Sequence, residues 1–163
     1  IFFRRLLIMG SLEVVVVEAR NLMAKDWNGK SDPFVVLECE GTQHKTVVMK
    51  KTLDPVWQQR FIFKVSDPHM AELYFECRDK DFLGSDLLGT YRMTLHSLVQ
   101  GEPNDQWLHL QNAKHGDLHV IITPQFKNGG LNTPAPRTGT GSGGKLHNTV
   151  GSIFNSINSK RSA

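Results

Sequence analysis

The segment ELYFECRDKDFLGSDLLGTYRMTL, residues 72–95, contains two stretches typical of β-strands with an acidic loop between them. Apolar and polar residues alternate over 72–78, which predicts a strand with one face in a core. A second strand-like stretch follows at 87–95. The loop that joins them, 79–86, mixes carboxylates with large apolar side chains and glycine. Burying carboxylates next to large apolar side chains is unfavourable, so packing in the core does not explain this loop.

Strand signals recur along the rest of the chain, with turn residues between them. The first 126 residues contain no amphipathic helix of three turns, and only 96–102 is predicted to form a helical turn. The predicted strands are 11–19, 32–40, 42–50, 59–65, 72–78, 87–95, 107–110 and 117–126. Eight short strands at this spacing predict an all-β fold, an eight-stranded antiparallel β-sandwich. Leu87 and Leu88, which begin the sixth strand, are expected to be buried in its core.

Charge and composition divide the chain into three regions. Residues 1–9 are predicted to be a leader, because Met9 followed by Gly10 resembles a natural start. Residues 10–126 form the predicted domain and carry 12 basic and 16 acidic residues, a net charge of −4. Residues 127–163 carry five Lys or Arg and no acid, and they are rich in Gly, Pro, Ser, Thr and Asn. We therefore expect a flexible, basic, disordered C-terminal tail.

One segment of the tail, residues 150–160, has apolar residues spaced as on one face of a helix. These residues are Val150, Ile153, Phe154 and Ile157. Two interpretations remain open. The apolar residues fall there by chance, since isolated helices this short are marginal in water, or the segment folds on a membrane or on a protein partner.

The two cysteines, Cys39 and Cys77, fall on the apolar phase of their predicted strands. Free cysteine is among the residues most often buried, so both are predicted to be small core residues. A disulfide framework or a zinc site would need more cysteines at tighter spacings. No apolar run approaches the roughly 20 residues that span a bilayer. Because the cysteines are not expected to form a disulfide, the compartment is predicted to be reducing and hence cytoplasmic.

The acidic loops become informative once the strands are paired. If neighbouring strands pair in a sandwich, the loops 20–32 and 79–86 emerge at the same end and bring five aspartates together. Like charges ~4 Å apart cost on the order of 1 to 4 kcal/mol per pair, so a bound cation would stabilise such a cluster. Carboxylates without nearby His or Cys are typical ligands of Ca²⁺. The other interpretation is that these aspartates only stabilise turns.

Three motifs, in order along the chain, resemble those of the C2 domain, a calcium-dependent phospholipid-binding β-sandwich. LMAKDWNGKSDPFVVL, 22–37, is similar to the first calcium loop of that family and the strand after it. KTLDPVWQQRFIFKV, 51–65, is similar to the segment that leads into its fourth strand. CRDKDFLGSDLLG, 77–89, is similar to its Asp-x-Asp loop closed by Asp-x-x-Gly. The resemblance covers residues 11–126 and implies the second of the two C2 topologies, type II.

Position by position, the resemblance implies a set of calcium ligands. The carboxylate ligands would be Asp26, Asp32, Asp79, Asp81 and Asp86. Main-chain carbonyl ligands would come from Lys25 and Lys80. The loop from Asp81 to Asp86 is one residue shorter than the common family pattern, which leaves open whether one or two ions bind.

The resemblance also implies two surfaces that contact lipid. Trp27, Phe82 and Leu83 would occupy the loop tips and insert into the membrane interface. Without calcium the acidic end is expected to be repelled by anionic lipid, and with calcium the apolar tips can enter it. A concave basic face would contact anionic phosphoinositides. Its residues would be Lys45, Lys50, Lys51, Arg60 and Lys64, unless these are ordinary solvated surface residues.

The sequence thus predicts a calcium-dependent phospholipid-binding module for reversible membrane recruitment in signalling or trafficking. The implied cofactor is Ca²⁺, and the implied partner is an anionic phospholipid membrane that a monomer joins peripherally. An enzyme is not expected, because no catalytic Ser/His/Asp or Cys/His set is indicated by local motifs. Nucleic acid is not expected either, because the basic charge is too sparse. The alternative function is that of a calcium-independent protein–protein interaction module.

Overall fold

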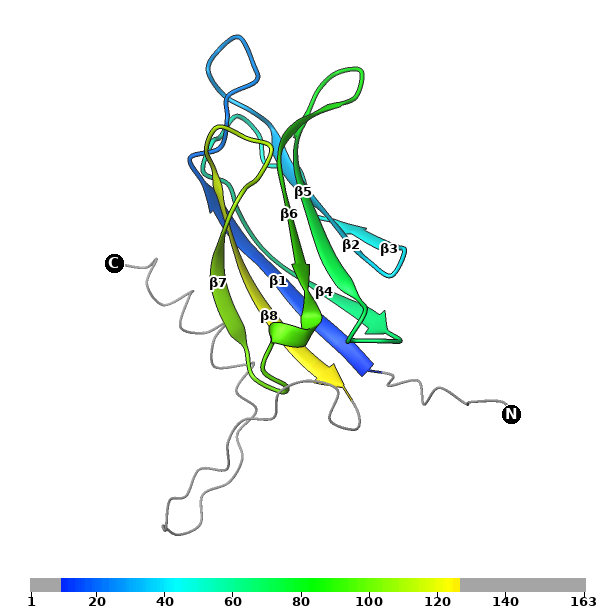
Figure 1. The fold of residues 1–163 in the computed structure, drawn as a ribbon. Helices are drawn as coiled ribbons and strands as arrows, with labels where there is room; N and C mark the ends of the chain where they lie inside the picture. The colour runs from blue at the N-terminus through cyan, green and yellow to red at the C-terminus, as the bar shows by residue number, and fades with distance from the viewer. Residues whose placement is uncertain (1–9, 127–163) are drawn as a thin grey trace, which may run out of the picture.

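A computed structural model describes residues 10–126, which form two antiparallel four-stranded sheets packed face to face (Figure 1). The elements are β1 (Gly10–Arg20), β2 (Pro33–Cys39), β3 (Thr42–Lys45), β4 (Val56–Val65), β5 (Glu72–Lys80), β6 (Ser85–Thr94), the 3-10 helix η1 (Leu95–Ser97), β7 (Asn104–His109) and β8 (Asp117–Phe126). The strand order is β4-β1-β8-β7 in the first sheet and β3-β2-β5-β6 in the second. The predicted all-β sandwich of eight antiparallel strands is confirmed. Its assignment to the type II topology stays a prediction.

The β-branched strand β1 lies in the middle of the first sheet. It pairs with β4 on one side and with β8 on the other, so Val14 lies opposite both Phe61 and Ile122. The run of four valines keeps both faces of this strand apolar. Val15 and Val17 face away from the second sheet, yet they are only 7% and 4% exposed. Strand β1 is therefore buried along both faces, as its sequence favours.

Strand β5 lies between β2 and β6 in the second sheet. The alternation predicted over 72–78 is observed, since Leu73, Phe75 and Cys77 are all fully buried. These side chains pack with the inward residues of the first sheet and form one hydrophobic core with them. Both cysteines are free and buried, and burial raises the pKa of each thiol to about 12. They are core residues, as predicted.

Several sequence-based expectations about the bounds of elements need correction. The third strand stops at Lys45 rather than at residue 50. From there Thr46 bonds to Val35 twice, through its backbone N–H and through its hydroxyl, which accepts the Val35 N–H. The Thr46 hydroxyl thus takes the place of the backbone carbonyl that would accept the Val35 N–H in a regular ladder. Regular strand pairing therefore ends there. The helical turn predicted over 96–102 is the short η1 at Leu95–Ser97.

Leu87 is not buried, contrary to expectation. The ladder between β5 and β6 pairs Arg78 with Leu87 but Cys77 with Gly89, so Leu88 is an extra residue in β6. This bulge turns Leu88 into the core, where it is fully buried. Leu87 then shares the outer face with Arg78 and is 37% exposed.

The predictions made for residues 1–9 and 127–163 lie outside the described residues. Among residues 10–126 no helix has the length and apolar character that crossing a bilayer requires.

Leu73→Ala removes a fully buried side chain from β5. We expect it to lower the free energy of unfolding by about 2–5 kcal/mol, through lost burial and the cavity left behind. Leu83→Ala removes the same side chain from a position that is 93% exposed, and it should change stability by less than about 0.5 kcal/mol. Urea unfolding of both variants measures the difference. Similar losses would contradict the placement of these two leucines.

Candidate metal site at the loop end

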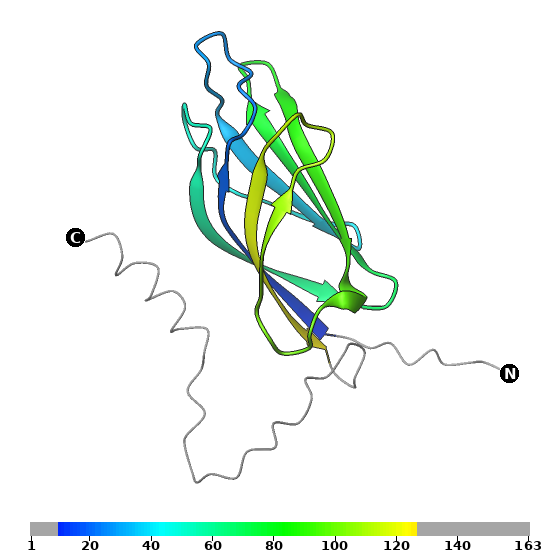
Figure 2. The same ribbon diagram turned by 60° about the vertical axis from the view of Figure 1, so that its left-hand side comes forward.

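Four connecting segments meet at one end of the sandwich (Figures 1 and 2). We call this the loop end and define it as residues 21–32, 46–55, 79–86 and 110–116. Backbone hydrogen bonds tie the segments together. The N–H of Leu22 donates to the Leu53 carbonyl at 3.0 Å, and the N–H of Lys80 donates to the Asp32 carbonyl at 3.0 Å. The loops are thus held on the rigid ends of the strands.

Three carboxylates converge at the loop end. Each of Asp26, Asp79 and Asp81 offers an oxygen, and these oxygens all lie within 4.8 Å of one another. Asp79 continues the inward face of β5 beyond Phe75 and Cys77, so its side chain is fully buried. The strand period therefore brings a carboxylate to the place where the core meets the loops.

Asp79 is incompletely bonded. Its Oδ1 accepts the backbone N–H of Asp32 at 2.5 Å. Its Oδ2 is buried and has no hydrogen-bond partner in the part of the chain that the structure describes. Burial raises the pKa of Asp79 and the nearby charges of Asp26 and Asp81 raise it further, whereas the Asp32 N–H and the Ser31 hydroxyl lower it. A buried carboxylate with a free oxygen suits a cation.

The first loop is braced from inside by Ser31, which is fully buried. Its hydroxyl donates to the Met23 carbonyl at 2.9 Å and accepts the Lys25 N–H at 3.1 Å. The Lys30 carbonyl then accepts the N–H groups of both Lys25 and Asp26. Sequence reasoning missed Ser31, because a serine in a loop rich in Gly, Lys and Asp gives no signal of burial. Its effect is to fix the backbone that carries Asp26.

Two of the five predicted carboxylate ligands lie beside the cluster rather than in it. Asp32 accepts the Lys51 N–H at 2.7 Å through Oδ1, and its Oδ2 lies 3.4 Å from the Lys50 ammonium. Asp86 lies opposite Asp79 in the ladder and is exposed, but its carboxylate is not part of the three-oxygen group. The structure thus brings three of the five together and keeps two next to them.

The predicted main-chain ligands are sequence neighbours of this cluster. Lys25 directly precedes Asp26, and Lys80 lies between Asp79 and Asp81. The backbone of Lys80 is fixed by its bond to Asp32, and the Asp81 N–H donates to the Gly84 carbonyl at 3.0 Å. Both lysines are therefore next to cluster carboxylates along the chain, and their role as ligands remains a prediction.

The three predicted tip residues are the most exposed large apolar side chains of the described chain. Trp27 is 98% exposed, Phe82 is 99% exposed and Leu83 is 93% exposed. Trp27 follows Asp26 in the first loop, and the other two follow Asp81 in the third. Large apolar side chains that are left together in water usually mark a site of contact.

The five predicted lipid-contacting basic residues are divided between the two sheets and the loop end. Lys45 closes β3 in the second sheet, whereas Arg60 and Lys64 belong to β4 in the first. Arg60 also pairs with Glu13 at 2.5 Å, which raises the pKa of its guanidinium. Lys50 and Lys51 lie in the loop end, beside Asp32.

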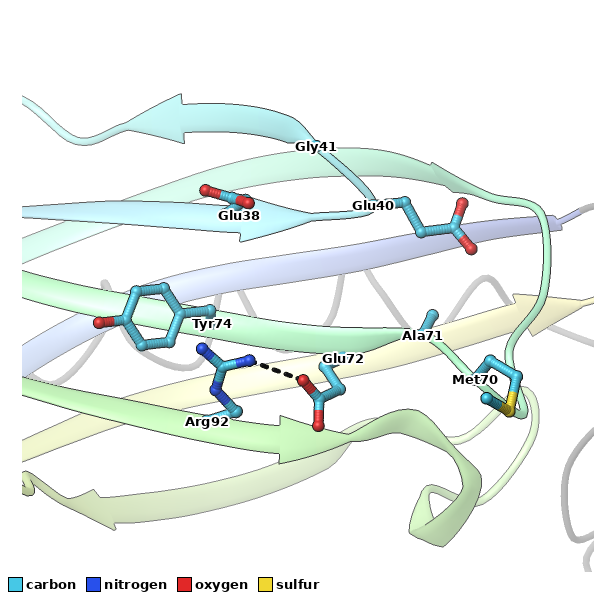
Figure 3. Close-up of a pocket in the computed structure, with 8 residues that line it drawn as sticks. All are labelled: Glu38, Glu40, Gly41, Met70, Ala71, Glu72, Tyr74 and Arg92. Carbon is cyan, nitrogen blue, oxygen red and sulfur yellow. Dashed lines mark hydrogen bonds and ion pairs between the residues drawn. The ribbon is translucent and has the colours of Figure 1, made fainter.

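A pocket of about 270 Å³ lies at the opposite end of the second sheet (Figure 3). Its residues are Glu38, Glu40, Gly41, Met70, Ala71, Glu72, Tyr74 and Arg92. Glu72 pairs with Arg92 at 2.7 Å, and Glu40 accepts the backbone N–H groups of Ser66 and Asp67. Most charged groups of this pocket thus have partners within the domain, whereas Oδ2 of Asp79 at the loop end has none among the described residues.

The raised pKa of Asp79 predicts a stability effect that depends on pH. The folded state holds a proton on this group up to a higher pH than the unfolded state, so this contribution to stability falls as pH rises through the raised pKa. In chelator at pH 7, Asp79→Asn should therefore raise the melting temperature, because it removes the buried charge and keeps the acceptor for Asp32. The gain should shrink as pH falls toward 4.

The matched control is Asp86→Asn, which removes a charge from an exposed neighbour in the same ladder. It should leave the melting temperature nearly unchanged at both pH values. A lower melting temperature for Asp79→Asn at pH 7 would contradict the account of a destabilising buried charge.

Comparison with known proteins places this geometry in a family. The model of the C2 domain family matches residues 10–110. Synaptotagmin-4 of Arabidopsis thaliana is 39% identical over 125 residues, which cover 74% of this chain and 22% of that protein. The chain thus spans about a fifth of the length of this curated relative.

Solved structures agree. A C2 domain of plant Extended Synaptotagmin 1 is 30% identical, with a TM-score of 0.70, and the match covers 76% of this chain and 99% of that one. A calcium-bound pair of C2 domains from Extended-Synaptotagmin 2 is 26% identical, with a TM-score of 0.63 over 71% of this chain and 45% of that one. The motifs, the sandwich and these matches agree, and the chain belongs to the C2 domain family.

Proposed function

We propose that this C2 domain binds phospholipid membranes through its loop end and that calcium controls the binding. The observation that supports it best is that two energetically unfavourable features lie together at the loop end. One is the cluster of Asp26, Asp79 and Asp81, with a buried oxygen that lacks a partner among the described residues. The other is the set of fully exposed apolar tips on the same two loops.

The residues at the loop end fit Ca²⁺. The donors are carboxylate and carbonyl oxygens, the set that this hard cation prefers, and no His or Cys belongs to the three-residue group. Asp26, Asp79 and Asp81 would hold the ion, with the carbonyls of Lys25 and Lys80 and the nearby carboxylates of Asp32 and Asp86. A bound Ca²⁺ supplies positive charge against these carboxylates and a binding position for headgroup oxygens.

The domain's own residues supply the rest of the attachment. Trp27, Phe82 and Leu83 already point away from the core, so burying them in the interface removes apolar surface from water. Each such side chain contributes about 1.5–3 kcal/mol when fully buried. Trp27 suits the headgroup boundary because its indole N–H can stay hydrated while its ring is buried. Three side chains of this kind give attachment that is real but reversible.

This function implies a cytoplasmic protein that becomes a peripheral membrane protein when calcium is present. A C2 relative whose structure was solved with calcium bound supports the choice of ion. The role is one of binding rather than of catalysis. The alternative is a calcium-independent protein-interaction module, in which the aspartates only stabilise the loops.

Vesicle sedimentation tests the proposal directly. With phosphatidylcholine and phosphatidylserine vesicles, the full chain should sediment in calcium and stay in the supernatant in chelator. Asp79→Asn should lose calcium binding in calorimetry and vesicle binding together, because the central carboxylate is gone. Sedimentation that ignores calcium, or an unchanged calcium affinity of Asp79→Asn, would favour the alternative.

Trp27→Ala tests the role of the tips in membrane binding separately from the role of the ion site. Calcium affinity in solution should stay within about twofold, because the indole is 98% exposed and offers no ligand atom to the ion. Vesicle binding in calcium should fall by about tenfold or more, since one buried aromatic is worth about 1.5–3 kcal/mol. Met70→Ala is the matched control, because Met70 is 73% exposed at the opposite end of the sandwich. Equal losses from both variants would contradict insertion of the loop end.

A further inference from the structure

The pocket shown in Figure 3 is acidic, and we call it the acidic pocket. Its charged residues are Glu38, Glu40, Glu72 and Arg92, which give it a formal charge of −2. Hydrogen bonds within the domain hold two of the carboxylates without neutralising them. Glu38 accepts the side-chain amide of Gln43 at 2.7 Å, and Glu40 accepts backbone N–H groups only. The pocket therefore remains attractive to a cationic group.

Apolar surface adjoins these carboxylates. Met70, which lines the pocket, is 73% exposed, more than any other large apolar side chain of the described residues outside the tips. The ring of Tyr74 lies between Glu38 and Arg92 across neighbouring strands, and the Arg92 guanidinium lies 4.9 Å from the centre of this ring. A ligand with both cationic and apolar side chains would match this lining.

The chain itself contains a segment of that chemistry. Residues 127–163, which we call the tail, carry five Lys or Arg and no acid. Within the tail, residues 150–161 combine four apolar side chains with two cationic ones. These six residues are Val150, Ile153, Phe154, Ile157, Lys160 and Arg161. The charge of this segment is opposite to that of the acidic pocket, and its apolar residues match the exposed Met70.

The tail starts at the end of the sandwich where the acidic pocket lies. The turn between β4 and β5 and the end of β8 both lie away from the loop end (Figures 1 and 2). The Leu95 N–H donates to the carbonyl of the pocket residue Ala71 at 3.3 Å, and the nearby Gln100 side chain donates to the Phe126 carbonyl at 2.9 Å. Segment 150–161 is thus tethered close to the pocket.

The tether has a suitable length. Twenty-three residues separate Phe126 from Val150. A Gly- and Ser-rich chain of this length spans roughly 24–29 Å on average. Short tethers of this kind give an effective concentration of about 1 mM, so even a weak contact becomes populated within one molecule. The pocket of the same chain is therefore favoured over that of a second copy in dilute solution.

We propose that residues 150–161 dock in the acidic pocket of their own chain. Lys160 and Arg161 face its glutamates, and the apolar side chains cover Met70 and the ring of Tyr74. The contact lies at the other end of the domain from the candidate metal site, so it does not depend on the proposed function. The tail then acts as a built-in ligand, which an external basic segment must displace before it can occupy the same pocket.

A nitroxide on the tail of the full chain tests this docking. Ser159→Cys supplies the thiol for a maleimide label at a position off the apolar face of the segment. Cys39 and Cys77 stay unlabelled, because both are buried and burial raises the pKa of each thiol to about 12. Amide spectra of the nitrogen-15 chain, recorded in chelator at low salt, show which residues the label broadens. The chemically reduced label gives the reference.

Matched double variants of the labelled chain identify the contact. Glu38→Gln with Glu72→Gln neutralises the pocket and keeps Glu40, whose hydrogen bonds hold the turn after β4. Glu18→Gln with Glu102→Gln is the control, because it removes the same charge from positions outside the pocket. A third variant, Lys160→Gln with Arg161→Gln, removes the cationic groups and leaves residues 10–126 unaltered.

The label should broaden the amides of Gly41 and Ala71 most strongly. The pocket variant and the tail variant should each weaken this broadening by about fivefold, since two exposed ion pairs are lost, and raised salt should weaken it as well. The control should change it by less than about twofold. Broadening centred on another surface, equal effects of the pocket variant and the control, or no broadening would overturn the proposal. Broadening of unlabelled nitrogen-15 chains by labelled chains would also overturn it, because the tail would then occupy a second copy.

Discussion

The candidate site depends on Asp79, which continues the inward-facing alternation of β5 beyond the hydrophobic core. Asp79 is the next inward residue of β5 after Phe75 and Cys77, so its carboxylate is carried into a fully buried position. Only one of its oxygens is bonded within the described chain. Asp26 and Asp81 add charge around it. The geometry of the sandwich thus creates an anionic site that its own described residues do not complete, and the exposed tips flank this site.

Local patterns were enough to predict the fold, because alternation and turn residues are local signals. All eight strands and the burial of both cysteines follow from them. What failed depended on contacts between different segments of the chain. The early end of β3 results from the hydroxyl of Thr46 on Val35, and the exposure of Leu87 results from a bulge set by pairing with β5. A period of two cannot show where a ladder shifts by one residue.

The candidate site was predictable to a similar degree. Strand pairing alone brings Asp26, Asp79 and Asp81 to one end, because the loops that carry them join strands of the same sandwich. It does not show that the carboxylate of Asp32 turns toward Lys50 and Lys51, which lie 18 and 19 residues further along the chain. Contacts between loops are a property of several segments together, and a motif in one loop does not reveal them.

The apolar tips have a kinetic consequence. Trp27, Phe82 and Leu83 stand free of the domain before any membrane is met, on loops fixed by hydrogen bonds to their neighbours. On the proposed function, membrane docking would then require no refolding of the protein, and collision and long-range attraction would limit the rate of association. A change in the size of the three tip side chains would then alter the dissociation rate far more than the association rate.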